Sequence, residues 1–204
     1  YLLLGRLGPL YAQIDFGVAE KMAFRSVARA VSITPEEVRR RYKEGGDLGE
    51  LVQELKSQLV SAKRGNRLTV GEVYELLKAL ATANGAGSQE TKIEWLAKLL
   101  LEASPVEGKY IMRMVLGKMR LGFSDKTILD ALAVMDGGSK QGREALNWAY
   151  QVSPDIGLIA SLVKQYGVAA VSSKVKATVG VPVLPCLAQR LKSADEMIKK
   201  MKKV

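Results

Sequence analysis

Apolar residues recur three and four positions apart along most of this 204-residue chain. The clearest examples are Val73, Leu76, Leu77 and Leu80, then Ile93, Leu96, Leu99 and Leu100, then Ile128, Leu129, Leu132 and Met135. This spacing places apolar side chains on one side of a helix, whereas a half-buried strand would alternate apolar and polar residues. No convincing alternation occurs. The pattern therefore predicts an all-α fold, a compact multi-helix domain of short helices.

Helix starts can be read from the polar residues. Four hydroxyl residues, Thr34, Thr69, Ser104 and Ser193, each have a glutamate three positions later. This is the spacing of a capping box, in which the side chain and backbone of the two residues exchange hydrogen bonds. Proline follows two of these residues, at Pro35 and Pro105, and proline suits the first helical position. A further helix is predicted to open at Ser153-Pro154-Asp155.

The character of the chain changes near Ala177. The stretch ATVGVPVLPCLAQRL contains two prolines, a run of β-branched residues and the single cysteine, Cys186. Prolines and extended-favouring residues indicate a linker or the first piece of another domain. We therefore predict a helical domain over residues 1–176 and a linker with the start of a second domain over 177–204. The basic end of the chain is interpreted as a terminal helix.

The charge of the chain favours a polyanionic partner. Lysine and arginine number 31 against 21 acidic residues, a formal net charge of +10. Nucleic acid is the first candidate and an anionic membrane surface the second, while a generally basic protein is the alternative. No apolar run approaches the roughly 20 residues of a membrane span. The chain has no histidine, which excludes Ser–His and Cys–His nucleophile pairs and every histidine metal site.

Two predicted helix starts share an unusual design. Ser88 and Ser124 each have a threonine three positions later, and glycine precedes them closely at Gly87 and Gly122. A helix N-terminus has unpaired backbone N–H groups and partial positive charge, and small residues let an anion approach it. The alternative is that each serine simply caps its own helix.

Cations gather at both of these starts. Lys92 follows the first, and Lys118, Arg120 and Lys126 surround the second. A cation at a helix N-terminus opposes the helix dipole, and a bound anion would offset that cost. Two loops of this kind suit the phosphates of a duplex, and we expect them to face outward on the same side of the molecule. Contacts to phosphates would position the protein without reading base sequence.

Several stretches resemble the N-terminal DNA-binding domain of ATP-dependent DNA ligases. The most specific is KYIMRMVLGKMRLGFSDKTILDALA, which has the family's G-K-x-R-[LI]-G turn between two helices. LTVGEVYELLKALATANGAGSQETKIEWLAKLL resembles the preceding helix, Gly-Ser loop and helix of that domain. ITPEEVRRRYKEGGDLGELVQEL and GVPVLPCLAQRL resemble its acidic-basic helix and the entry to the nucleotidyltransferase domain, although cysteine replaces the usual methionine. The family's domain begins further upstream, so the resemblance implies residues before Tyr1.

The resemblance implies a non-sequence-specific grip on the minor-groove side of nicked double-stranded DNA, in replication and repair. Its implied DNA contacts are Gly87, Ser88, Thr91 and Lys92 in one loop, and Lys118, Arg120, Leu121, Gly122 and Ser124 in the other; Lys126 is added from the charge pattern alone. A whole ligase would use ATP and Mg²⁺. It would also contact its own catalytic domains, with a sliding clamp left open as a further partner. The expected location is the cytoplasm of an archaeon or bacterium, or a eukaryotic nucleus.

The K-x-D-G motif, whose lysine accepts AMP in this family, occurs nowhere in the chain. We therefore expect no cofactor in this segment and no catalysis by it alone, although the parent protein would be a ligase. An alternative function is a helical scaffold that binds an acidic protein through its basic surface. A fixed-period helical array would favour that scaffold, and the sequence has only the short Ser-x-x-Thr echo.

Overall fold

The chain is all-helical in the computed structural model, which describes residues 1–59, 68–137, 140–185, 191 and 193–201. The described residues contain no strand, so the predicted all-α class is confirmed. The α-helices are α1 Glu20–Val31, α2 Pro35–Gly45, α3 Leu48–Gln58, α4 Val70–Thr82, α5 Ser88–Glu102, α6 Pro105–Val115, α7 Asp125–Gly137, α8 Arg143–Val152, α9 Ile156–Tyr166, α10 Val168–Lys174 and α11 Ala194–Met201. Short 3-10 turns occur at Leu2–Leu4, Leu10–Ala12 and Lys140–Gly142.

All four predicted hydroxyl caps are present. Thr69 and Ser104 form complete capping boxes with Glu72 and Glu107. Thr34 accepts a hydrogen bond from the Glu37 backbone N–H at 3.2 Å, and Ser193 accepts one from that of Glu196 at 3.3 Å. The fifth start differs, because α9 begins at Ile156. Its cap is Asp155, the last residue of the predicted Ser153-Pro154-Asp155 start, whose carboxylate accepts hydrogen bonds from two backbone N–H groups.

The larger of two buried clusters joins α1 to α6. In it α3 packs extensively on α6, and α1 packs on α5. The predicted stripe of α5 is fully buried, whereas Leu76 of α4 remains on the surface. Gly49 at the start of α3 sits close to α6, since a Cβ there would lie 2.7 Å from the Lys109 carbonyl oxygen. Close packing therefore fixes α6, which leads into the loop that carries the predicted cations.

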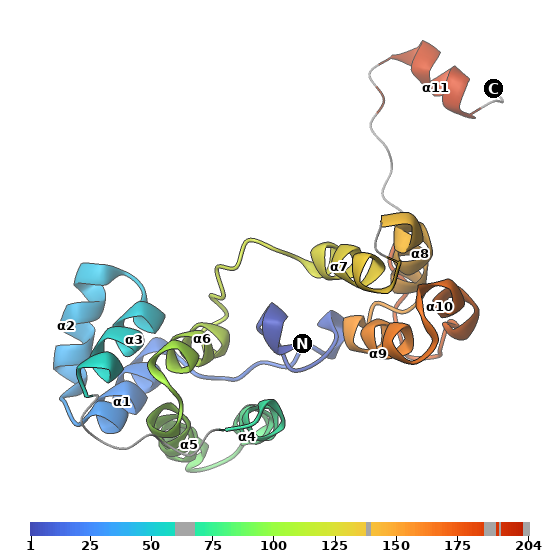
Figure 1. The fold of residues 1–204 in the computed structure, drawn as a ribbon. Helices are drawn as coiled ribbons and strands as arrows, with labels where there is room; N and C mark the ends of the chain where they lie inside the picture. Colours follow the sequence, from blue (N-terminus) through green and yellow to red (C-terminus); the bar gives the residue numbers. More distant parts are fainter. Residues whose placement is uncertain (60–67, 138–139, 186–190, 192, 202–204) are drawn as a thin grey trace.

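The second buried cluster consists of α7 to α10. Its centre includes Leu129 and Ala133 of α7, which are 0% and 2% exposed. The buried stripe of α7 is centred on these two residues, so Met135, predicted to be buried, lies on the exposed side of the helix. Figure 1 shows α1–α6 and α7–α10 as separate groups, connected by the extended segment between α6 and α7.

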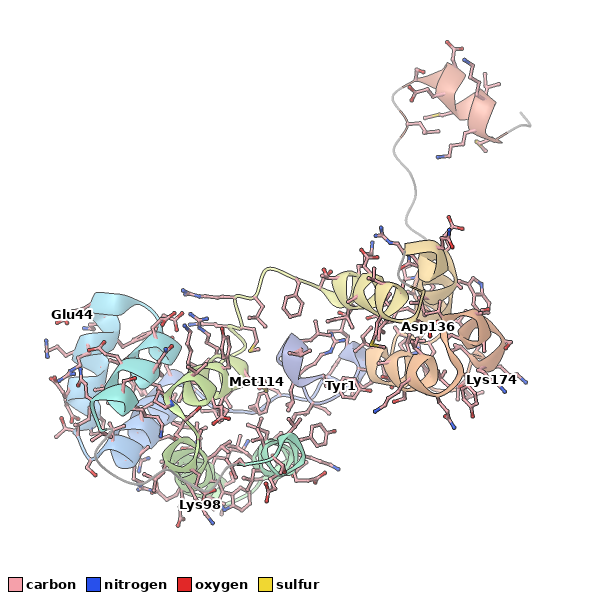
Figure 2. All side chains as sticks on the ribbon, viewed as in Figure 1. Tyr1, Glu44, Lys98, Met114, Asp136 and Lys174 are labelled. Atoms are coloured by element: carbon pink, nitrogen blue, oxygen red, sulfur yellow. The ribbon has the colours of Figure 1, made fainter. Side chains whose placement is uncertain are left out.

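The N-terminal segment fastens the two groups together. Arg6 forms an ion pair with Asp125 at the start of α7, and the Tyr1 hydroxyl donates a hydrogen bond to Asp155. On the other side, the Tyr74 hydroxyl donates to the Leu7 carbonyl oxygen at 2.9 Å. In Figure 2 Tyr1 lies between the two helical groups. The first few residues therefore connect the two groups by polar contacts and by apolar packing, with Leu2 against the first cluster and Leu4 against the second.

Residues 177–204 follow these groups, and α11 has no buried residue. Within this part of the chain, residues 186–190, 192 and 202–204 lie outside the described residues, and they include Cys186. None of the described helices combines the length and apolar character that a membrane crossing requires. The predicted boundary at residue 177 stays a prediction.

Candidate nucleic-acid interface

The connection between α6 and α7 has an unusual backbone. Three of its residues adopt the left-handed region, Gly117 at φ 65°, Arg120 at φ 54° and Gly122 at φ 71°. Glycine adopts this region without strain, whereas a residue with a side chain rarely does. Arg120 therefore has a backbone conformation that is uncommon for a residue with a side chain. We call residues 117–124 the cationic loop.

The cationic loop exposes its two basic side chains. The side chain of Lys118 is 51% exposed and that of Arg120 is 56% exposed. Gly122, Ser124 and Lys126 are also exposed, whereas Leu121 is half-buried. The structure thus brings the predicted residues of this segment together on an accessible stretch of chain, ahead of α7.

Each of the two cations is paired with a carboxylate from another part of the chain. Lys118 pairs with Glu20 of α1 at 3.2 Å, and this hydrogen bond raises the pKa of Lys118. Arg120 pairs with Asp47 before α3 at 3.3 Å. A carboxylate oxygen and a phosphate oxygen accept the same charge-assisted hydrogen bonds. Both cations therefore bind anionic oxygen atoms even in the absence of a nucleic acid.

Asp47 has a second and closer partner. The Arg113 guanidinium donates to it at 2.7 Å, and both side chains are nearly buried, at 12% and 9% exposure. Burial alone would raise the pKa of Asp47, but hydrogen bonds from Arg113 and from the Glu50 and Gly49 backbone outweigh it and lower this pKa. Lys109 pairs similarly with Glu50 at 2.7 Å. Arg113 and Lys109 therefore hold α6 to α3, and Arg120 is the more accessible partner of Asp47.

The other predicted loop precedes α5. Gly87 caps this helix in the left-handed region at φ 80°, and no side chain contributes a cap hydrogen bond. Ser88 is the first helical residue, so the simple capping explanation does not hold for this serine. The Thr91 hydroxyl donates to the Gly87 carbonyl oxygen at 3.3 Å, which fastens the turn. In the cationic loop the roles differ, because the Ser124 backbone N–H donates to the Thr127 hydroxyl at 3.3 Å.

Lys92 is not the surface cation that the sequence indicated. It is 7% exposed, and its Nζ donates to the Phe16 carbonyl oxygen at 2.7 Å. A buried ammonium group needs such a partner because leaving water is costly for a charge. Lys92 therefore anchors the segment before α1, and we remove it from the expected direct contacts.

A row of cations on α1 was missed by the sequence reasoning. Lys21, Arg25 and Arg29 recur every four residues and are all exposed. Arg25 and Arg29 both pair with Glu90, in the first turn of α5. The regular spacing was a readable signal in the sequence. Because Glu20 contacts Lys118 and Arg25 contacts Glu90, α1 is tied to both predicted loops.

The family of this chain follows from comparison with known proteins. Residues 1–133 match the family model described as DNA ligase N terminus. The chain belongs to this family. The match covers both predicted loops and α1, and it confirms the resemblance that the motifs indicated.

Relatives of the DNA ligase N terminus family align along nearly the whole chain. DNA ligase 2 of Thermofilum pendens is 42% identical over 213 residues, and the DNA ligase of Staphylothermus marinus is 41% identical over 216. A probable DNA ligase of Aquifex aeolicus is 39% identical over 201 residues. Each alignment covers 98% of this chain but only 35%, 36% and 34% of the relative. The chain thus spans about a third of the length of these relatives.

Within the described residues, no group of three or more His, Cys, Asp or Glu side chains could hold a metal ion.

Proposed function

We propose that this chain is the part of an ATP-dependent DNA ligase that holds double-stranded DNA by its phosphate backbone beside a nick. The observation that carries the proposal is the cationic loop. Its left-handed residues expose Lys118 and Arg120, which already bind carboxylate oxygen atoms. Phosphate oxygen atoms can replace those carboxylates because they carry the same charge and accept the same hydrogen bonds.

Recognition would be independent of base sequence. The cationic loop offers backbone groups, glycines and two cations. These can contact phosphate and sugar, which occur at every step of a duplex. No described helix presents a set of arginine and asparagine side chains toward a groove in the manner of direct base readout. The α5 loop with Gly87, Ser88 and Thr91 would supply a second set of contacts to the same duplex, and Leu121, Gly122, Ser124 and Lys126 would complete the first.

The remaining partners belong to the whole protein. We propose that residues 177–204 lead into a nucleotidyltransferase domain, where ATP and Mg²⁺ would bind and the nick would be sealed. Two apolar residues of α11, Met197 and Ile198, are 46% and 52% exposed, which suits a helix completed by further protein. A sliding clamp stays open as a partner, since no feature of the described residues identifies its docking peptide.

The test is a salt titration of DNA binding. Fluorescence anisotropy would measure the Kd of the chain for a labelled nicked duplex, for an intact duplex and for nicked duplexes of unrelated sequence. The variant K118Q/R120Q should weaken binding similarly on every sequence. It should also make the slope of log K against log salt shallower by about 1.8, since each phosphate contact contributes about 0.9.

The matched control is K78Q/K98Q, which removes two exposed cations from α4 and α5. Lys98 projects on the side of the protein away from the α6–α7 connection in Figure 2. The control should retain the parent slope. Parent-like affinity and slope in K118Q/R120Q, or equal losses in both variants, would overturn the proposal. A higher affinity for nicked than for intact duplex would support the nick-directed part of it.

A further inference from the structure

The exposed side of α1 has a regular row of cations, Lys21, Arg25 and Arg29, which we call the α1 row. The opposite side of the helix is buried, with Ala23 and Val27 at 0% exposure. Four helical residues rise about 6 Å, so the row extends for about 12 Å. One strand of B-DNA advances about 3.4 Å per nucleotide, so this length matches about three to four successive phosphates.

The α1 row lies between the two predicted loops. At one end Glu20, the neighbour of Lys21, pairs with Lys118 of the cationic loop. At the other end Arg25 and Arg29 pair with Glu90, two residues after Ser88. A backbone that touched both loops would therefore pass close to α1.

Glu90 leaves both arginines largely free to bind elsewhere. The side chains of Arg25 and Arg29 are 48% and 46% exposed, and each donates to Glu90 through a single nitrogen, Nη2. A guanidinium has five N–H donors, so most of those of each arginine remain available. An ion pair this exposed contributes little to folding stability. A role in attaching α1 to α5 therefore does not explain well why two arginines share the single carboxylate of Glu90.

We propose that the α1 row is a phosphate-binding surface that continues the duplex contact between the two loops, and that Glu90 occupies Arg25 and Arg29 until a phosphate replaces it. This inference rests on the proposed function and adds residues to it. Glu90 is then a residue that weakens DNA binding, because its charge competes with phosphate for the same guanidinium groups.

The first test removes the two arginines. In the same anisotropy titration with nicked duplex, R25Q/R29Q should make the salt slope shallower by about 1.8, which corresponds to two lost phosphate contacts. The matched control is R39Q/K43Q, which removes two exposed cations with the same four-residue spacing from α2. The control should retain the parent slope. An unchanged slope in R25Q/R29Q, or the same reduction in both variants, would overturn the inference.

The second test distinguishes a DNA-binding role of the two arginines from a structural role by whether the DNA affinity rises or falls. E90Q should raise the affinity for DNA by about twofold to fivefold, the range that one exposed ion pair can supply. If the arginines serve only to hold α1 on α5, E90Q would lower the Tm and leave DNA affinity unchanged or reduced. That result would overturn the inference. Should R25Q/R29Q fail to fold, as judged by circular dichroism, E90Q and the single variant R25Q decide the question.

Failure of the inference differs from failure of the proposed function. If K118Q/R120Q reduces the salt slope while R25Q/R29Q and E90Q behave as the parent, DNA binding stands and the α1 row is not part of it. If the parent itself binds duplex without salt dependence, the proposed function fails and the inference fails with it.

Discussion

Arg113 of α6 donates a hydrogen bond at 2.7 Å to Asp47, the residue that caps α3. The same carboxylate accepts from two backbone N–H groups of α3 and pairs with Arg120 of the cationic loop at 3.3 Å. One largely buried acidic side chain therefore fixes a helix start, a contact between two helices and the position of an exposed cation. Its removal should affect both stability and DNA binding.

The contribution of Asp47 to stability should depend on pH. Its pKa is lower in the folded chain than its ordinary value of 3.8, so the folded state favours the ionised form. The stabilisation is therefore present above pH about 4 and is lost as the pH falls through the folded pKa. D47N should cost about 1.5 kcal/mol at pH 7, because Asn can still cap α3 but leaves Glu50 as the carboxylate partner of Arg113.

Urea unfolding at pH 7, 4 and 2.5 measures this dependence. The difference in unfolding free energy between the parent and D47N should be largest at pH 7 and should shrink at pH 2.5. A difference that stays constant over this range would show that the ion pair with Arg113 does not contribute in the manner described.

Gly49 and Gly71 provide a matched pair of substitutions, since each is the second residue of a capped helix. A Cβ at Gly49 would lie 2.7 Å from the Lys109 carbonyl oxygen and 2.8 Å from Arg113 Cγ. G49A should therefore destabilise the chain by about 2 kcal/mol through overpacking between α3 and α6. A Cβ at Gly71 would meet nothing nearer than 4.0 Å, so G71A should stabilise by about 0.5 kcal/mol.

Thermal or urea unfolding of both variants gives the comparison. Opposite signs are the expected result. If the two substitutions had the same sign, close approach of α3 and α6 would not be the reason for glycine at residue 49.

Lys92 should be a structural residue without a direct role in DNA binding. K92M keeps a long unbranched side chain but leaves the Phe16 carbonyl oxygen without its donor. The expected cost is about 2 kcal/mol of unfolding free energy. The slope of DNA affinity against salt should match that of the parent, measured by anisotropy where both proteins are folded. A slope shallower by about 0.9 would instead assign Lys92 a phosphate contact.

Local features of the fold could be predicted from the sequence because they depend on neighbours along the chain. The caps at Thr69 and Ser104 need only a glutamate three residues away, and both are present. The stripe containing Leu96 and Leu100 is buried as expected. The predicted start at Ser153-Pro154-Asp155 is also present, and Asp155 caps it, although serine and aspartate both suit that role and only the fold selects between them.

The electrostatic environment of the candidate site could not be predicted, because its partners are distant in sequence. The stretch from Lys109 to Lys126 contains five cations and a single acidic residue, Asp125, so the local sequence gives no partner for Lys109 or Arg113. In the structure Lys109 and Arg113 are neutralised by Glu50 and Asp47 of α3. Lys92 was misread for a similar reason, since its acceptor is a backbone carbonyl 76 residues away.

The bonds of Tyr1 and Arg6 to Asp155 and Asp125 have a consequence for how the chain is made. A ribosome delivers the N-terminal segment first and its partners 119 and 154 residues later. The full set of these contacts can therefore form only after Asp155, which caps α9, has been synthesised.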